Sequence, residues 1–235
     1  NSPAICPSFL QGRRVDWLEE FVPGSLYAPY ATSLRMSDLG YRNKSQAGLS
    51  VSVNSLDHYV RDLTAAISTP NPEYENIGVK VDDEYRQLNA NILQIENEYY
   101  SFIRPKRVTL SGERPTKALQ RAGVQYVEMR SLDVSVFDPV GVNQNKLRFL
   151  EAFAAFCVLS TSAPIQSSEQ AELDGNHGRV AREGRRQGLT LRRDGHDVSL
   201  RDWALEIVDS MRGVCELLDE GDAQRPYTSA LDMQA

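Results

Sequence analysis

The sequence predicts an α+β fold, and three observations lead to it. Stretches that alternate like strands and stretches with helical periodicity follow one another in irregular order, which favours an antiparallel sheet with flanking helices over repeated βαβ units. Hydrophobic residues make up 41% of the chain and charged residues 25%, which is the balance of an ordinary globular protein. At 235 residues, the chain has the length of one large domain or two small ones.

The first half of the chain mixes short strands with one clear helix. The first fifty residues carry glycine, proline and aromatic residues with little periodicity, so loops and short strands are expected there. A helix is predicted over 54–68, with Asn54 as its cap. Residues 79–81 and 85–88 flank three acidic residues and predict a β-hairpin. Residues 90–103 have the composition of a long, partly buried strand.

The second half is expected to be richer in helix. A short helix over 115–121 precedes the cleanest strand pattern of the chain, over 123–134. The helix over 143–159 is so apolar near its end that burial nearly all round is expected. Two further helices are predicted over 168–185 and 199–220. We therefore expect a sheet-containing core over 1–160 and a mostly helical extension over 161–235.

Composition and missing motifs exclude several classes of protein. The chain has 26 Lys and Arg against 32 Asp and Glu, a net charge of −6 that argues against a dedicated nucleic-acid partner. Its longest apolar run, Ala152–Leu159, is far shorter than the ~20 residues of a membrane helix. The three cysteines have no C-x-x-C spacing, and Cys157 and Cys215 are expected to be buried, which fits a reducing cytosol. No dinucleotide, P-loop, zincin or nucleophile-elbow motif occurs.

One strand pattern carries residues suited to phosphate chemistry. Over 124–130, a period of two places Glu128 and Arg130 on one face, about 6.7 Å apart and each with room for its own partner. A lone pair of this kind is more typical of a solvated face with a cross-strand ion pair.

A second polar pattern makes a functional role for this face as well supported as a structural one. If 90–103 is a strand, Glu96, Glu98 and Tyr100 share one of its faces, and a neighbouring Glu128 would complete a platform of carboxylates. Clustered carboxylates suit Mg²⁺, and an adjacent arginine suits phosphate oxygens. Magnesium-assisted phosphate chemistry and a polar structural sheet are both left open by the residues alone.

Three more stretches could bind ligands. Residues 30–45, which contain Arg35 and Tyr41, could hold a small zwitterion with arginine on its carboxylate and tyrosine walls, or could be a surface loop. Residues 103–107 could reach a phosphate or simply end the strand. The arginines between Arg179 and Arg201 are interleaved with acidic residues, so a solvated helical face is favoured over a nucleic-acid patch.

Several stretches, in order along the chain, resemble proteobacterial glutamate–cysteine ligases. They are Ser2–Cys6, Tyr30–Ser45 (YATSLRMSDLGYRNKS), Leu93–Glu98 (LQIENE), Ile103–Val108 (IRPKRV) and Tyr126–Asp133 (YVEMRSLD). The resemblance runs from residue 2 to about residue 160, and more loosely over Arg182–Leu191.

The resemblance implies a glutamine-synthetase-like antiparallel sheet and a cytoplasmic enzyme of glutathione biosynthesis. With ATP and Mg²⁺, such an enzyme phosphorylates the glutamate γ-carboxylate, and the cysteine amine then attacks the acyl phosphate. On the matching positions, Glu128 resembles a magnesium ligand and Arg130 a catalytic, phosphate-contacting arginine. Arg35, Tyr41 and Tyr100 resemble the pocket for the acceptor cysteine, with Arg35 on its carboxylate.

One departure from the family is large. Its members have a long segment before the point where this sequence begins, and that segment carries most of the acidic metal ligands and much of the nucleotide site. The resemblance therefore implies that residues 1–235 are one partial catalytic domain that works with the remainder of the enzyme chain and is inactive alone. The alternatives are another carboxylate–amine ligase of the same superfamily and a non-catalytic amino-acid-binding or interaction module.

Overall fold

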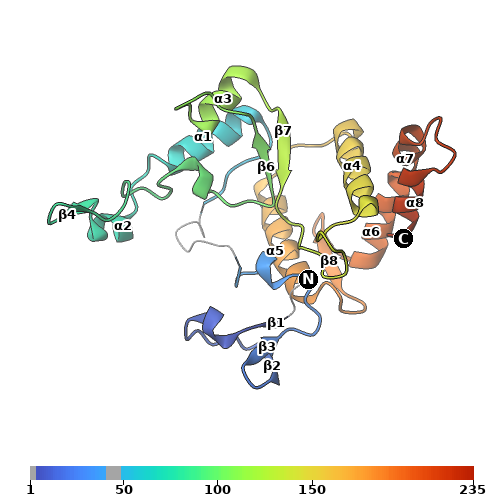
Figure 1. Ribbon diagram of the computed structural model, residues 1–235, viewed down its shortest axis with the longest axis horizontal. Helices are drawn as coiled ribbons and strands as arrows, with labels where there is room; N and C mark the ends of the chain where they lie inside the picture. Colours follow the sequence, from blue (N-terminus) through green and yellow to red (C-terminus); the bar gives the residue numbers. More distant parts are fainter. Residues whose placement is uncertain (1–3, 41–48) are drawn as a thin grey trace. The chain divides into compact units, whose positions relative to one another are not determined.

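The computed structural model describes residues 4–40 and 49–235 and divides the chain into two compact units (Figure 1). Unit 1 comprises residues 1–40 and 133–235, and unit 2 comprises residues 41–132. The units therefore divide the chain after residues 40 and 132, and not at residue 160, where we predicted the boundary between a sheet-containing core and a helical extension. That one partial catalytic domain spans 1–235 stays a prediction. In the ranges described, no helix combines the length and the apolar composition needed to cross a bilayer.

Unit 1 opens with a small antiparallel sheet. Its strands are β1 (Ala4–Ile5), β2 (Glu19–Val22) and β3 (Ser25–Tyr27), in the order β1-β3-β2. Two short 3₁₀ helices, η1 (Pro7–Leu10) and η2 (Leu34–Met36), lie on either side of β2 and β3 in sequence. Three apolar side chains that follow the sheet are buried together, namely those of Ala28, Ala31 and Leu34. The loops and short strands expected here are confirmed.

The rest of unit 1 is mostly helical. It contains α4 (Gln144–Leu159), α5 (Ser167–Glu183), the hairpin β8 (Thr190–Arg193) and β9 (His196–Ser199), α6 (Leu200–Ser210), α7 (Arg212–Leu218) and α8 (Pro226–Asp232). The helices predicted over 143–159 and 168–185 are confirmed. The single helix predicted over 199–220 is wrong, because α6 and α7 are separate and meet at Met211, two residues before the weak helix former Gly213.

The core of the helical part lies between α4, α6, α7 and α8 (Figure 1). Its buried members are Ala152, Val208, Met211, Cys215 and Leu231. The burial expected for Cys215 is confirmed.

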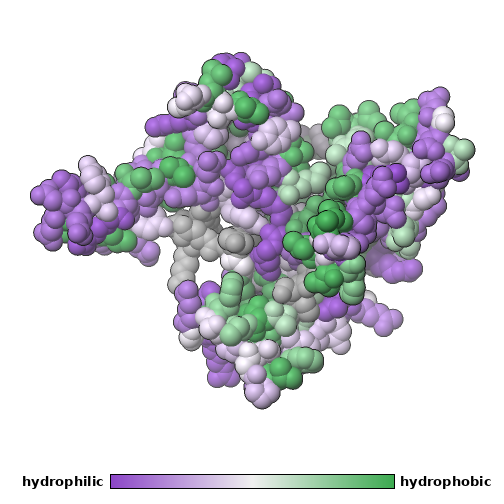
Figure 2. Space-filling model, viewed as in Figure 1, coloured by the Kyte–Doolittle hydropathy of each residue, from purple (hydrophilic) through white to green (hydrophobic). Residues whose placement is uncertain are grey.

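Helix α4 is covered on one side, so the prediction that it is buried nearly all round is wrong. Ala152 is its one fully buried residue, Val158 is 84% exposed, and the exposed Cys157 contradicts the burial expected for that thiol. The preceding segment also exposes Phe137, and Figure 2 shows hydrophobic residues at the surface there. Several apolar side chains of α4 are therefore not covered by the described residues of unit 1.

The carboxyl end of α5 holds the segment that contains Thr32. The Thr32 hydroxyl donates to the Val180 carbonyl at 2.6 Å, and the backbone N–H groups of Thr32 and Ser33 both donate to the Ala181 carbonyl. Arg185 adds hydrogen bonds from its side chain to the carbonyls of Ala31 and Pro29. We call these contacts the α5 clamp. They join residues about 150 positions apart and fix the chain just before η2.

In its described residues, unit 2 combines three α-helices with one β-hairpin and a second antiparallel strand pair, whose strands are separated by α3. It contains α1 (Leu56–Ala66), α2 (Pro72–Ile77), β4 (Lys80–Val81), β5 (Glu84–Tyr85), η4 (Glu96–Glu98), β6 (Ile103–Lys106), α3 (Pro115–Ala122) and β7 (Tyr126–Met129). The predicted first helix, the β-hairpin and the short helix are confirmed. The expected cap Asn54 is wrong by one residue, because the Ser55 side chain accepts from the His58 N–H.

The apolar core of unit 2 lies where α1 meets α3. Tyr59, Val60 and Leu63 of α1 pack with Leu119 of α3 and with Leu93, which is fully buried. By contrast, α2 and the β4–β5 hairpin are hydrophilic at the surface, as the left end of Figure 2 shows. The turn of that hairpin uses Asp82 and Asp83 in the left-handed conformation, at φ 50° and 66°.

The long strand predicted over 90–103 is wrong. Backbone groups of this stretch are bound outside any ladder: the Gln94 carbonyl accepts from the Asn89 amide, Gln94 N–H donates to the Glu98 side chain, and Leu93 N–H donates to the Ala66 carbonyl. A strand begins only at Ile103, as β6. The strand predicted over 123–134 exists but is shorter, as β7, and pairs antiparallel with β6.

Two buried carboxylates cap helices from outside them. Glu96 accepts from both the N–H and the hydroxyl of Thr116 in the first turn of α3. Asp219 does the same for Thr228 in α8 and also accepts from Tyr227 N–H. Both helices begin with proline and lack a side-chain cap of their own, so these acids satisfy N–H groups that would otherwise be unpaired.

The α5 clamp requires a glycine at position 184. A Cβ there would lie 2.6 Å from both the Thr32 Cγ2 and the Val180 carbonyl oxygen. We therefore expect Gly184→Ala to lower the free energy of unfolding by about 1–3 kcal/mol through overpacking, as measured by urea denaturation. Gly175→Ala, on the same helix with open space around its Cβ, is the control. It should raise stability by about 0.5–1 kcal/mol. Equal stability of the two variants would contradict the clamp.

Candidate functional site

The β6–β7 pair places several charged side chains on one face. Its register sets Arg104 opposite Glu128 and Lys106 opposite Tyr126, and directly opposite residues of an antiparallel pair share a face. The pairing continues just past β7, where Arg130 N–H donates to the Phe102 carbonyl at 2.8 Å. The period-two alignment of Glu128 and Arg130 predicted from sequence therefore rests on a real, short strand.

Glu128 and Arg130 pair with each other. The Arg130 Nη2 donates to Glu128 Oε1 at 3.2 Å, and Nε lies 3.1 Å from Oε2. The expectation that each has its own separate partner is wrong in this respect. The Arg130 hydrogen bond is the main cause that holds the pKa of Glu128 below its ordinary value, although burial opposes it, and the charges of Lys106 and Arg104 add to the effect. Glu128 is therefore an ionised carboxylate at neutral pH.

Tyr100 joins this pair. The Arg130 guanidinium carbon lies 5.8 Å from the centre of the Tyr100 ring, within the range of a cation–π contact. Three of the residues singled out from sequence, Tyr100, Glu128 and Arg130, are thus close together in unit 2. This arrangement places one carboxylate and one planar cation side by side, next to an aromatic ring.

The platform of carboxylates expected beside Glu128 is wrong. Glu96 is buried against Thr116, and Glu98 lies in η4, where its side chain accepts from Gln94 N–H. Within residues 4–40 and 49–235, no three His, Cys, Asp or Glu side chains are grouped so that they could hold a metal ion. Glu128 alone is therefore the described carboxylate that fits the oxygen chemistry of Mg²⁺ at this face.

Arg35 belongs to unit 1 and is held by an acid from the far end of the YVEMRSLD motif. Its Nε donates to Asp133 Oδ1 at 2.7 Å, and the Asp133 side chain is only 14% exposed. Gly40 permits the turn that follows η2, since a Cβ there would lie 1.7 Å from the Arg35 carbonyl oxygen. Tyr41 lies outside the described residues. Because Arg35 and Tyr100 belong to different units, the acceptor pocket they were assigned to stays a prediction.

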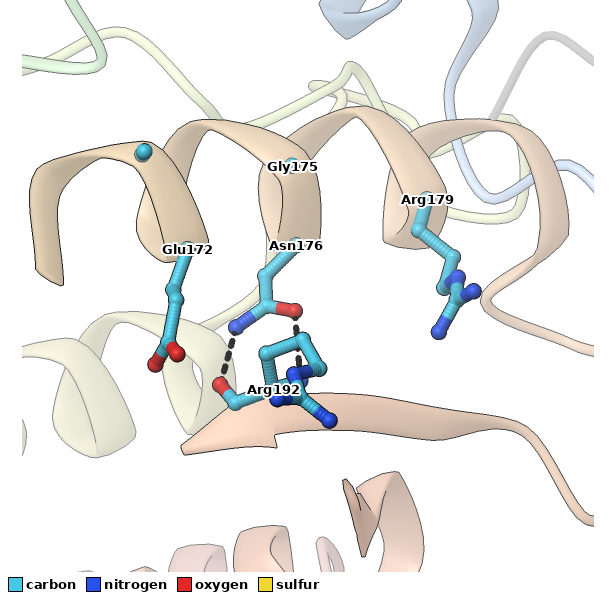
Figure 3. Close-up of a pocket in the computed structure, with 6 residues that line it drawn as sticks. Glu172, Gly175, Asn176, Arg179 and Arg192 are labelled. Carbon is cyan, nitrogen blue, oxygen red and sulfur yellow. Dashed lines mark hydrogen bonds between the residues drawn. The ribbon is translucent and has the colours of Figure 1, made fainter. Parts of the chain in front are cut away.

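A hollow between α5 and β8 is occupied by contacts that hold these two elements together. It measures about 350 Å³ and is lined by Glu172, Asn176, Arg179 and Arg192 among others (Figure 3). Asn176 donates to the Arg192 carbonyl and accepts from Arg192 N–H, so its amide fixes the hairpin to the helix. Among the predicted site residues that the structure describes, namely Arg35, Tyr100, Glu128 and Arg130, none lines this hollow.

Most of the arginines between Arg179 and Arg201 are partnered inside unit 1. Arg182 pairs with Asp38, Arg192 with Asp197, and Arg193 with Glu206. Arg179 donates to the Thr190 carbonyl, and Arg185 belongs to the α5 clamp. Arg179 and Arg182 lie on α5, as the predicted solvated helical face requires, but Arg192 and Arg193 lie in β8, so the prediction is wrong for these two. The contacts give several of these arginines a structural role that the sequence did not reveal.

Comparison with known proteins decides the family. The sequence model of the family described as glutamate–cysteine ligase matches residues 1–180. The chain belongs to this family. A glutamate–cysteine ligase from Alcanivorax borkumensis is 51% identical over 238 residues, which cover 99% of this chain and 45% of that protein. One from Shewanella oneidensis is 52% identical, over 93% of this chain and 42% of that protein.

A solved structure supports the same assignment. The glutamate–cysteine ligase of Francisella tularensis, in complex with AMP, matches with a TM-score of 0.88 and 35% identity, over 99% of this chain and 46% of that one. The α+β fold and the family resemblance predicted from sequence are thereby confirmed. The chain spans less than half the length of these ligases.

The Glu128–Arg130 ion pair predicts a lowered pKa for Glu128 and a matching pH dependence of stability. We expect the Glu128 carboxyl to titrate below 4.5 and the Arg130→Gln variant to bring its pKa back toward that value, as followed by NMR of the side-chain carbon. Because the folded-state pKa is depressed, the pair contributes stability above about pH 4.5 that is lost as pH falls through the folded-state value. Arg114→Gln, an exposed charge change in the same unit, should leave the Glu128 titration unchanged. An unshifted carboxyl in the wild type would contradict the pairing.

Proposed function

We propose that this chain supplies part of the active site of a cytoplasmic, ATP-dependent glutamate–cysteine ligase. The reaction joins the γ-carboxylate of glutamate to the amine of cysteine through γ-glutamyl phosphate, as the first step of glutathione biosynthesis. One observation carries the proposal: in a chain of this family, Glu128 and Arg130 lie paired beside Tyr100 at the end of β7. The AMP bound to the solved relative supports a nucleotide as one substrate.

Arg130 and Glu128 would handle the phosphate chemistry. In this mechanism the Arg130 guanidinium contacts the transferring phosphoryl group with two parallel N–H donors and offsets the negative charge that develops there. Glu128 is one ligand of Mg²⁺, which when bound would neutralise phosphate charge. In the protein without substrate, Glu128 keeps Arg130 oriented through their hydrogen bond, so the guanidinium is held before phosphate arrives.

The acceptor would be bound by Arg35, Tyr41 and Tyr100. Arg35 binds the cysteine carboxylate in this proposal, and the two tyrosines form the walls of the pocket. The ion pair with Asp133 fixes the Nε side of Arg35, and the α5 clamp fixes the backbone three residues earlier. An acceptor held in this way has its amine oriented toward the acyl phosphate, so little translational and rotational entropy remains to be lost in the reaction.

The proposed partners are glutamate, cysteine, ATP and the remainder of the ligase chain, with no nucleic acid or membrane. The curated relatives that match this chain are more than twice as long as the part it covers. Since the described residues contribute one carboxylate to the proposed metal site, we propose that the other metal ligands come from that remainder. The 235 residues alone are then expected to form no γ-glutamylcysteine.

The test is made in the intact ligase that contains this chain. Glu128→Gln and Arg130→Ala should each lower kcat/KM for γ-glutamylcysteine formation by at least about a hundredfold, and calorimetry should show weaker Mg²⁺-dependent ATP binding. Lys117→Gln, an exposed charge change on α3, is the control and should leave both readouts unchanged.

Three outcomes would contradict the proposal. Ligation at the wild-type rate by Glu128→Gln or Arg130→Ala would remove these residues from the chemistry. Mg²⁺- and ATP-dependent ligation by the 235 residues alone would show that no further segment is needed. An acceptor other than cysteine, used with higher kcat/KM by the intact enzyme, would favour a different carboxylate–amine ligase of the superfamily.

A further inference from the structure

Unit 2 contains a cavity of about 310 Å³ between the β6–β7 pair and helices α1 and α3. Buried residues line its inner part, among them Tyr59, Glu96 and Arg104, whereas the exposed Thr109 and Tyr126 mark its opening. The half-buried Lys106 and Arg107 lie between the two. A cavity of this size and depth is in the range that accommodates a small ligand.

The charges around this cavity do not balance. Three of its lining residues are cations, namely Arg104, Lys106 and Arg107, and one, Glu96, is a carboxylate. Glu96 uses its two oxygens on Thr116, at 2.7 and 2.6 Å. Among the residues that the structure describes, none of the three cations has a carboxylate oxygen within 4.0 Å. Glu128, opposite Arg104 in the register, already forms its ion pair with Arg130.

Arg104 is the clearest sign that an anion belongs here. Its side chain is 3% exposed, and its Nε–H has no acceptor within the described ranges. Its neighbour in the cavity is the Tyr59 hydroxyl, a neutral group whose pKa is raised by burial while Arg104 opposes that rise. Glu128 and Glu96 are the nearby acids, but neither forms a close ion pair with Arg104, so the desolvation of this buried guanidinium is only partly offset.

We propose that this cavity binds a phosphate group. Two positive charges remain after Glu96 is counted against the three cations, which matches a doubly charged phosphate better than a carboxylate. Arginine presents its donors in a planar fork suited to phosphate oxygens, and Lys106 adds a second point charge near the opening. The cavity is larger than one phosphate group needs, so the phosphate is attached to a larger molecule or shares the space with water.

Two sources share this chemistry. One is a phosphate of the nucleotide, and that assignment rests on the proposed ligase function. The other is free inorganic phosphate, which needs no ligase activity. The stretch Ile103–Arg107, which the sequence singled out as able to reach a phosphate, supplies all three cations of the cavity and so agrees with either source.

The test is calorimetric titration of the protein with AMP, adenosine and inorganic phosphate, without Mg²⁺, glutamate or cysteine. We expect AMP to bind and adenosine not to bind. Lys106→Gln should weaken AMP binding at least about tenfold, because a charge-assisted contact is lost. Lys117→Gln is the matched control, since it removes the same charge from the exposed face of α3. Arg104→Gln should abolish binding, and if it does not fold, Lys106→Gln decides.

The possible outcomes show whether the phosphate cavity and the ligase function stand or fail independently of each other. Binding of inorganic phosphate as tight as that of AMP supports the cavity with free phosphate as its source, and binding of AMP alone supports it with the nucleotide. The proposal is overturned if neither ligand binds or if Lys106→Gln leaves the Kd unchanged. If Lys106→Gln changes nothing while Glu128→Gln still abolishes ligation in the intact enzyme, the cavity fails and the ligase function stands. If phosphate binding depends on Lys106 while ligation is unaffected by Glu128→Gln, the cavity stands and the ligase function fails.

Discussion

The placement of Arg35 depends on how helix α5 ends. The last carbonyl groups of a helix lack donors from a following turn. Here the Val180 carbonyl keeps the Gly184 N–H, and a segment about 150 residues away in sequence supplies further donors. The Ala181 carbonyl accepts two N–H groups, and the Val180 carbonyl accepts the Thr32 hydroxyl. The close approach is possible because residue 184 is a glycine. One set of hydrogen bonds thus satisfies the helix end and fixes the chain that leads into Arg35.

In unit 2, a residue distant in sequence likewise satisfies the end of a helix, here the start of α3. Glu96 uses its carboxylate to cap α3, which leaves Arg104 without that carboxylate as an ion-pair partner. Glu128, on the neighbouring strand, is likewise taken by Arg130. The acids of this unit therefore hold helices and side chains in place, while cations face the cavity and the end of β7. The proposed phosphate site rests on this division of roles.

The positions of several helix starts were predictable from sequence, whereas two other local features were not. Asn143 and Ser199 cap the helices that the pattern predicted, because a cap acts within four residues. The strand predicted over 90–103 was wrong because backbone groups of this stretch bind side chains and a helix carbonyl, which composition does not reveal. The β8–β9 hairpin was missed although Asp194-Gly195, both at positive φ, is a recognised turn signal.

In the candidate site, the residues were predictable from sequence, but their interaction partners were not. A period of two found Glu128 and Arg130, but their mutual ion pair depends on side-chain geometry. The partner of Arg35, Asp133, lies 98 residues away, and no periodicity connects positions so far apart.

The most direct test of the α5 clamp is amide hydrogen exchange by NMR at Thr32 and Ser33. Both N–H groups donate to the Ala181 carbonyl, so their protection should match that of the last turn of α5, and Gly184→Ala should reduce it at both residues together. Exchange at the rate of an unprotected loop, with α5 itself still protected, would contradict the claim that this helix end holds the segment leading to Arg35.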